Sequence, residues 1–130
     1  MIVADASAVL EFLLGGSRAR VVEAHLLDET AIQVPALLDA EVAQVLRRMV
    51  AGATVQEARA RASLEILGDM PLQRHLLMPL LPRMWALRDN LTAYDAAYVA
   101  LAEALDCALV TFDEKIARAP GHTAKVVTLR

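Results

Sequence analysis

The stretch MIVADAS, residues 1–7, opens the chain with a short apolar segment that ends in an acid. The apolar part predicts a buried strand, and apolar residues at helical spacing over residues 7–14 predict a helix directly after it. Strands alternating with helices are typical of a parallel sheet covered on both faces. We therefore predict an α/β fold with a central parallel sheet of about four to five strands flanked by helices. Further strands are predicted at residues 31–34, 72–76, 108–111 and 126–129.

Capping signals predict where several helices begin. Ser17 is expected to cap the helix after a double glycine, and Thr92 is expected to cap another. Residues 54–57, TVQE, have the pattern of a capping box. Tyr94 and Tyr98 are expected on one stripe of the helix that Thr92 opens. The predicted helices span residues 7–14, 17–27, 37–50, 54–68, 79–87, 92–105 and 114–118.

The composition predicts one small domain outside the membrane. The chain has 130 residues, of which 57% are hydrophobic and 4% aromatic, which favours Ala-, Leu- and Val-rich helices on a small sheet. The most apolar stretch, residues 76–87, contains two prolines and an arginine and falls short of the roughly 20 apolar residues of a membrane span. No signal-peptide pattern opens the chain, so we expect a cytoplasmic protein. Its single cysteine, Cys107, is expected to be a buried, inert thiol.

The net charge of −3 is unusual for a protein that binds nucleic acid, since such proteins are usually basic. Four of the acids are candidates for neutralisation by a cation. Without those four, twelve acids remain against thirteen Lys and Arg, a balance of +1. The acidic total therefore argues only weakly against a nucleic-acid substrate.

These four acids lie in apolar surroundings near predicted helix starts: Asp5, Glu41, Asp95 and Asp113, the acidic quartet. Asp5 and Asp113 each follow a predicted strand. Right-handed crossovers bring the carboxyl ends of parallel strands to one edge of the sheet, where ligands bind. Each acid also has an ordinary interpretation, as a helix cap or as a first-turn residue that complements the helix dipole. Asp39 competes with Glu41 for the second role.

A cluster of carboxylates would point to metal-dependent hydrolysis of a phosphodiester. Such carboxylates repel one another unless a cation joins them, and hard divalent ions prefer oxygen ligands. Bound metal ions activate a water and stabilise the leaving oxygen. His25, His75 and His122 are scattered without metal-binding spacing, so surface or structural roles are expected for them. The quartet therefore predicts a magnesium site, with manganese as the alternative.

The quartet lies in four motifs: IVADASA at residues 2–8, PALLDAEV at 35–42, LTAYDAAYVALA at 91–102 and LVTFDEK at 109–115. Together and in this order, they resemble the PIN-domain family, and within it the VapC-like ribonuclease toxins of type II toxin–antitoxin systems. The resemblance covers essentially the whole chain. It implies a single Rossmann-like PIN domain spanning residues 1–130.

The resemblance also implies an Mg²⁺-dependent endoribonuclease, the toxin component of its system, which inhibits growth or translation. The acidic quartet matches the family's catalytic, metal-binding acids. Ser7 and Thr111 match hydroxyl positions that help to hold metal, water or neighbouring carboxylates. The implied partners are an RNA substrate, a small cognate antitoxin and a second copy of the chain in a homodimer.

Basic residues near the quartet are candidates for RNA contact, because phosphate contacts supply the salt-dependent part of the affinity. Arg47 and Arg48 are predicted on the helix that carries Glu41, and Lys115 and Arg118 lie beyond the last acid of the quartet. For each of them, a solvated helix face is an equally good interpretation. Because few aromatic residues are present to stack on bases, recognition of RNA shape and backbone is favoured.

Two alternatives remain open, a non-catalytic PIN-like interaction module and a housekeeping PIN nuclease without an antitoxin. The intact quartet argues against the first, since a binding protein has no reason to keep four clustered acids. An aspartyl-nucleophile phosphatase is disfavoured because Ser7 stands where a second acid is needed. Serine hydrolases are disfavoured because the chain has no G-x-S-x-G motif.

Overall fold

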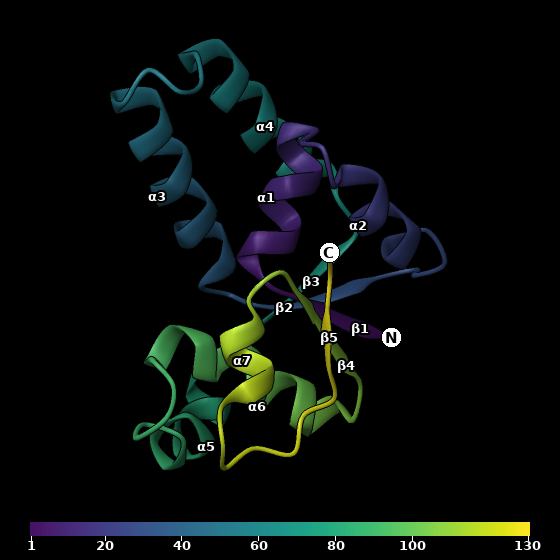
Figure 1. Cartoon of the computed structure of the whole chain (residues 1–130), viewed down its shortest axis with the longest axis vertical. Helices are drawn as coiled ribbons and strands as arrows, with labels where there is room; N and C mark the ends of the chain where they lie inside the picture. The colour runs from purple at the N-terminus through teal and green to yellow at the C-terminus, as the bar shows by residue number, and fades with distance from the viewer.

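A computed structural model describes residues 1–130 and shows a central sheet between two groups of helices (Figure 1). The strands are β1 (Ile2–Ala4), β2 (Ile32–Pro35), β3 (Leu72–His75), β4 (Ala108–Thr111) and β5 (Val126–Thr128). All five are parallel, in the order β3-β2-β1-β4-β5. The predicted α/β fold with a parallel sheet is therefore confirmed.

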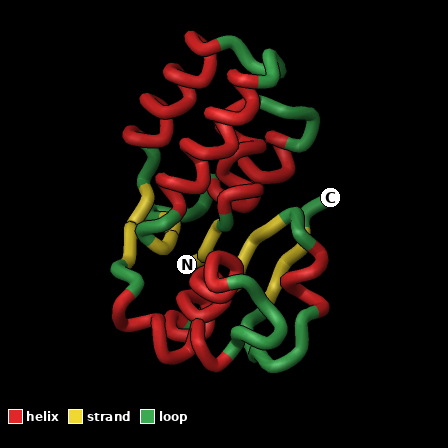
Figure 2. The backbone as a smooth tube through the Cα atoms, turned by 90° about the vertical axis from the view of Figure 1, so that its left-hand side faces the viewer, coloured by secondary structure: helices red, strands yellow, loops and turns green.

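Seven α-helices and one short 3-10 helix cover the sheet. They are α1 (Ala6–Leu14), α2 (Ala19–Leu26), α3 (Leu38–Ala51), α4 (Glu57–Asp69), η1 (Met78–Leu80), α5 (Leu81–Ala86), α6 (Ala93–Leu105) and α7 (Glu114–Arg118). In Figure 1, α1 to α4 lie on one side of the sheet and α5 to α7 on the other. Figure 2 shows the same three layers from the side, with the strands between two groups of helices.

The strand order contains a reversal between β1 and β4. The chain builds β1, β2 and β3 in one direction and then returns to place β4 on the other side of β1. Ala4 of β1 is paired with Val110 of β4, and the amide of Asp5 donates to the carbonyl of Val110 at 3.2 Å. Ligands bind at such a switch point, outside the carboxyl ends of the strands. Residues that follow β1 and β4 therefore share one crevice.

The core is built largely from Ala, Val and Leu, as the composition predicts. Val3 and Leu109, in the central strands, are fully buried. Helix α6 is buried continuously from Ala96 to Ala102 and packs against β1, β2 and β4. Its many alanines allow this close approach, because a short side chain leaves the helix near the strands. No helix of the chain has both the length and the apolar character needed to span a membrane.

Two of the predicted helix caps are wrong. Ser17 does not cap α2, because the helix begins only at Ala19, with Arg18 in the cap position and no side-chain cap. The predicted capping box fails because the amide of Thr54 donates to the carbonyl of Met49, at 2.8 Å, and completes the end of α3. Helix α4 then begins without a side-chain cap. In both places the helix begins later than the predicted cap requires.

Of three other local predictions, the cap at Thr92 is confirmed, and those for Tyr94 and Cys107 are wrong. Thr92 caps α6 as predicted, with its hydroxyl accepting the amide of Asp95 at 3.1 Å. Tyr94 does not share the buried stripe of Tyr98, since the two are 63% and 2% exposed. The buried part of α6 starts only after its first turn, so Tyr94 projects into solvent. Cys107 is half-buried rather than buried, and burial raises the pKa of its thiol.

Candidate functional site

Asp5 stands at the end of β1 and is the N-cap of α1. One oxygen of its carboxylate accepts the Ala8 amide at 3.1 Å and the Ser7 hydroxyl at 2.6 Å. The other oxygen accepts the Thr111 hydroxyl at 2.5 Å. The side chain is buried, so these donors replace the water that it loses on folding. The cap interpretation of Asp5 is therefore correct, and it leaves the carboxylate fixed at the switch point.

Ser7 and Thr111 join the start of α1 to the end of β4. The Ser7 oxygen accepts the amide of Phe112 at 3.1 Å while its hydroxyl donates to Asp5. The Thr111 oxygen accepts the amide of Asp113 at 2.9 Å while its hydroxyl donates to the other Asp5 oxygen. Both hydroxyls thus orient a carboxylate, which is one of the roles that the sequence resemblance implies.

The other three acids of the quartet come from separate helices. Asp113 is the N-cap of α7 and accepts the amide of Lys115 at 2.9 Å. Asp95 lies in the first turn of α6, and Glu41 lies in the first turn of α3. The Tyr98 hydroxyl donates to Glu41 at 2.6 Å and links α6 to α3. Each acid is therefore held at the start of a helix by the local fold.

The pKa values of Asp5, Glu41 and Asp95 are raised by burial and by the charges of other acids of the quartet. Burial raises the pKa of Asp5, and the charge of Asp113 raises it further against the hydrogen bonds that lower it. The pKa of Glu41 is raised by burial and then by the charges of Asp95 and Asp5. Burial also raises the pKa of Asp95, with added contributions from Asp113 and Asp5. The structure thus brings the quartet into one electrostatic neighbourhood.

No basic side chain forms a salt bridge with any member of the quartet. The competing acid Asp39 differs in this respect, because Arg74 of β3 donates to both of its carboxylate oxygens, at 2.7 and 2.9 Å. The structure therefore separates the two acids of α3 that the sequence leaves unresolved. Asp39 has its own counter-charge, and Glu41 faces the other acids.

The donor set fits a hard divalent cation. It consists of carboxylate oxygens that repel one another and have no basic partner, and oxygen is the ligand that Mg²⁺ and Mn²⁺ prefer. No group of three or more Asp, Glu, His or Cys side chains closes around a single point. The fit therefore rests on charge and donor chemistry, not on a closed shell of ligands.

The two arginines predicted on α3 face different cavities. Arg48 lines a cavity of about 380 Å³ that Glu41 also lines. Arg47 lines a larger cavity, about 510 Å³, between α3 and α4, and no member of the quartet borders it. The larger cavity is not the better candidate for a substrate site, because only the smaller one is lined by an acid of the quartet, Glu41. Of these two candidates for RNA contact, only Arg48 shares a cavity with the quartet.

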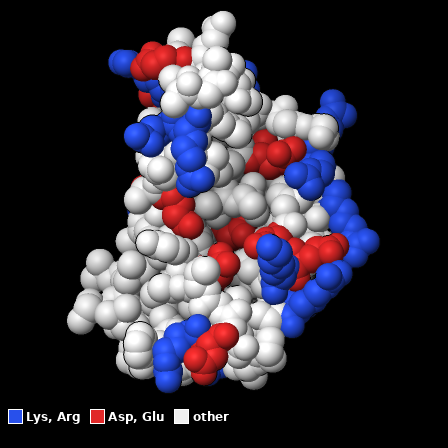
Figure 3. All heavy atoms as spheres, turned by 60° about the vertical axis from the view of Figure 1, so that its left-hand side comes forward, with Lys and Arg blue, Asp and Glu red and all other residues white.

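The two basic candidates on α7 also differ from each other. Lys115 is exposed next to Asp113, and Arg118 is paired with Glu114 at 3.0 Å. On the face shown in Figure 3, acidic atoms line a hollow across the middle of the molecule, with Lys and Arg on either side. A negatively charged substrate that approached the hollow would therefore meet basic side chains around it.

The three histidines lie outside the quartet. His75 shares a hydrogen bond with Gln33 at 2.6 Å, and His25 is exposed on α2. His122 lies 2.8 Å from the carbonyl oxygen of Ile116 and accepts the amide of Ala124 at 3.2 Å. The expectation of surface or structural histidines agrees with these positions.

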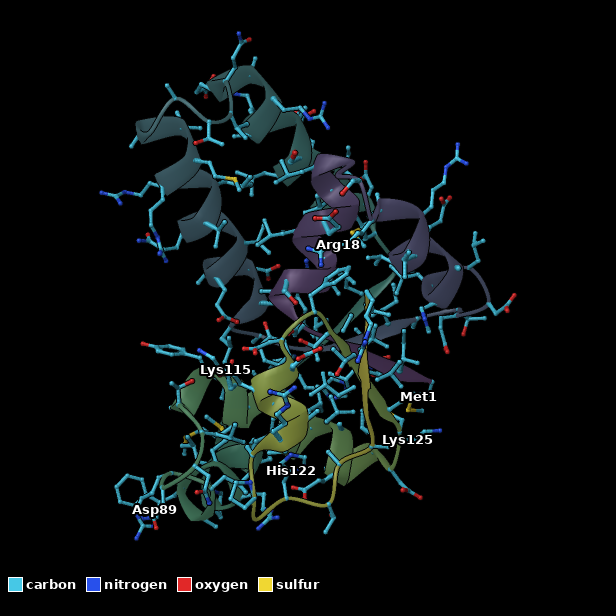
Figure 4. All side chains as sticks on the ribbon, viewed as in Figure 1. Met1, Arg18, Asp89, Lys115, His122 and Lys125 are labelled. Carbon is cyan, nitrogen blue, oxygen red and sulfur yellow. The ribbon has the colours of Figure 1, made fainter.

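Sequence reasoning missed two side chains at the site. Tyr98 was assigned only to a helix stripe, although its place three residues after Asp95 puts both on one face of α6. Arg18 was not considered at all. Its guanidinium lies 4.0 Å from the ring centroid of Phe112, and Figure 4 shows it reaching back along α1. No signal in the sequence links Arg18 to Phe112, because the contact depends on how the loop after α1 folds back.

Comparisons with known proteins agree with this geometry. The model of the PIN domain family matches residues 2–122. Ribonuclease VapC1 of Mycobacterium tuberculosis (strain ATCC 25618 / H37Rv) is 43% identical over 98% of this chain and 97% of its own length. Ribonuclease VapC9 of the same strain is 43% identical over 89% of this chain and 88% of its own length.

A solved structure supports the fold independently. VapBC2 from Rickettsia felis, crystallised bound to a DNA fragment from its promoter, contains a chain that matches with a TM-score of 0.72. The match covers 100% of both chains at 14% identity, so it bears on the fold alone. The family model, the two relatives and this shared fold lead to one conclusion: the chain belongs to the PIN domain family, in which these relatives are named VapC ribonucleases.

Proposed function

We propose that this protein is an Mg²⁺-dependent endoribonuclease and the toxin component of a type II toxin–antitoxin system. The observation that carries the proposal is the acidic quartet, four carboxylates without a basic partner, three of which have pKa values raised by burial and by other acids of the quartet. The relatives named ribonuclease support RNA as the substrate. Mn²⁺ is the alternative metal, since it accepts the same oxygen ligands.

In this proposal the residues of the quartet are the metal ligands and the catalytic acids. When bound, the metal would lower the pKa of a water and neutralise charge on the scissile phosphate. Ser7 and Thr111 hold the Asp5 carboxylate in one orientation, and Tyr98 does the same for Glu41. Because burial and mutual repulsion raise the pKa values of the acids, protons compete with the cation as the pH falls.

Cleavage of RNA by the purified protein tests the nuclease. We expect cleavage with Mg²⁺ or Mn²⁺, none in EDTA, and none for Asp5→Asn or Asp95→Asn. Asp39→Asn is the matched control, because Asp39 lies on α3 beside Glu41 but is bound by Arg74. Full activity in EDTA would refute the metal mechanism, and an active Asp5→Asn would remove that residue from the site.

The toxin role is tested by expression in cells. We expect growth arrest on induction of the wild type and normal growth with Asp5→Asn. Co-expression of a small partner encoded beside this protein should restore growth. The VapBC2 complex of the same fold supports such an antitoxin partner. Equal growth with the wild type and Asp5→Asn would favour a housekeeping nuclease, which cleavage of RNA in vitro would then identify.

The proposal includes a cytoplasmic homodimer of single PIN domains spanning residues 1–130. Its support is a set of exposed apolar side chains from the end of β3 to α5, in which Leu76, Met78 and Trp85 are 77%, 74% and 69% exposed. Exposed apolar side chains that gather on one surface are typical of an interface between proteins. Light scattering should give twice the chain mass for the wild type and a smaller mass for Trp85→Asp. A monomeric wild type would refute the dimer.

A further inference from the structure

We propose that the cavity beside Glu41 is a nucleotide subsite, which takes one unpaired base of RNA and the phosphate next to it. The inference rests on the proposed nuclease function and adds where the strand is held. The cavity measures about 380 Å³ and lies between the starts of α1 and α6 and the face of α3 that runs from Ala40 to Arg48. Glu41 belongs both to this cavity and to the acidic quartet, so a nucleotide held here adjoins the catalytic acids.

The lining of the cavity combines an apolar floor with polar groups. The floor is formed by Ala6, Ala40 and Val45, and the polar groups come from Gln44, Arg48 and Tyr94. Small apolar side chains leave room for a planar ring, and ligand sites commonly combine such an apolar lining with a few polar groups. Here the polar groups supply an amide, a guanidinium and a phenol to the same cavity.

Tyr94 supplies the aromatic ring for stacking. It is 63% exposed although it is the residue before Asp95, while Tyr98, one turn later, is buried. An exposed ring next to a catalytic acid gains contact area when a base stacks on it, and unstacked bases of single-stranded RNA commonly bind in this way. Tyr94 therefore adds one stacking contact to the recognition of RNA shape and backbone that the sequence favours.

Arg48 and Gln44 are free to bind a ligand. Arg48 forms no salt bridge, in contrast to Arg61 and Arg74, whose guanidinium groups are engaged by Glu57 and Asp39. Gln44 lies one turn before Arg48 and borders the same cavity, and its amide has no hydrogen-bond partner within the protein. A free guanidinium binds a phosphate, and a free amide can both donate to and accept from a base edge.

These features favour a nucleotide over a peptide segment as the occupant. The cavity offers one ring, one cation and one amide around a floor of small side chains. A peptide helix would need deep apolar pockets at helical spacing, which alanines do not provide. The three polar groups match the three parts of a nucleotide, in that the ring stacks on the base, the amide meets its edge and the guanidinium meets the phosphate.

Binding of labelled single-stranded RNA tests the subsite in EDTA, where a metal-dependent enzyme does not cleave. Fluorescence anisotropy is measured with a mixed-sequence oligonucleotide and with an abasic strand of the same length. We expect Tyr94→Ala to weaken binding of the RNA about 5- to 150-fold, the effect of losing one base–aromatic stack. Binding of the abasic strand should not change, and Tyr94→Phe should bind like the wild type.

Arg48 is tested against its neighbour on the same helix. Arg48→Met should weaken binding of both strands and reduce the slope of log affinity against log salt by about 0.7, the loss of one phosphate contact on a single strand. Arg47→Met is the matched control, because Arg47 lines the other cavity, and its slope should stay closer to that of the wild type. Trp85→Leu removes an exposed ring on α5 that does not line the cavity. This variant should keep the difference in affinity between the RNA and the abasic strand.

Three results would overturn the subsite: equal effects of Tyr94→Ala on RNA and abasic strand, no effect on either, or equal slopes for the two arginine variants. If Tyr94→Ala bound RNA like the wild type but paired more weakly with a co-expressed antitoxin, the cavity would be assigned to a peptide instead. The proposed function fails separately, if the wild type cleaves no RNA with Mg²⁺ although its base-dependent binding in EDTA is present.

Discussion

Replacing Tyr98 by Phe removes one oxygen atom from the site and leaves the ring in the core. The hydroxyl donates to Glu41 at 2.6 Å, and the side chain is only 2% exposed, so the ring has no room to move. A hydrogen bond to a charged group contributes about 1.5–3 kcal/mol to the free energy of unfolding. Because Glu41 is half-buried and can regain water, we expect the lower end, about 1.5 kcal/mol.

That free energy converts to a melting temperature through the unfolding entropy. At about 2.1 cal/mol/K per residue, a chain of 130 residues has an unfolding entropy of about 270 cal/mol/K, so Tm should fall by about 5 °C. The bond also lowers the pKa of Glu41 against burial, so its removal raises that pKa further. The loss should therefore be largest at neutral pH and shrink as acid protonates Glu41 in both proteins.

Metal binding should weaken as well, because Tyr98 orients a proposed ligand. Loss of a partner behind a ligand typically lowers metal affinity about 10- to 100-fold. Scanning calorimetry of the metal-free protein and calorimetric titration with Mn²⁺ measure both effects. Tyr94→Phe is the control, since it makes the same chemical change four residues earlier on an exposed ring. If Tyr98→Phe matched this control in Tm and metal affinity, the role of the Tyr98–Glu41 bond would be refuted.

Three further predictions concern stability. Because three pKa values of the acidic quartet are raised, the metal-free folded state takes up protons at a higher pH than the unfolded state does. Stability against urea should therefore increase as the pH falls from neutral toward the ordinary carboxyl pKa values of 3.8 and 4.5, and a decrease over that range would contradict the clustering. Thr111→Val should cost about 1–3 kcal/mol in the same assay, because it removes a donor to Asp5 and an acceptor of a backbone amide, and Thr111→Ser should retain most of the stability. The Arg83 guanidinium lowers the pKa of Glu103 to about 2, so Arg83→Met should cost about 1 kcal/mol at neutral pH. That cost should fade as the pH drops from 4.5 toward 2, and a cost independent of pH would point to lost packing instead.

The architecture could be predicted from the sequence because the signals are local and repeat. Apolar runs followed by helical spacing identify β1 and β4, and right-handed crossovers then place Asp5 and Asp113 at one edge. The order of the strands could not be predicted, since it depends on which side of β1 the chain returns to. The predicted caps at Ser17 and Thr54 fail because both helices begin later than the local pattern predicts, and the amide of Thr54 completes the end of α3 instead.

The candidate site could be predicted only as a set of residue types. The motifs identify the acids, but they do not show that Asp39 has a counter-charge on β3 while Glu41 has none. They also do not separate Arg47 from Arg48, because that difference depends on how α3 is rotated against its neighbours. Tyr94 and Tyr98 were expected on one stripe, yet only the second reaches the core. Each of these distinctions requires packing between helices that are distant in sequence.

Asp5 and Asp113 each begin a helix, and that double use affects how the protein can change by mutation. Asparagine caps a helix about as well as aspartate does. A single exchange at either position therefore deletes a negative charge and keeps the helix start. If the quartet is catalytic as we propose, one such exchange would remove the activity and leave a folded chain, so inactive alleles should persist as intact proteins rather than as degraded ones.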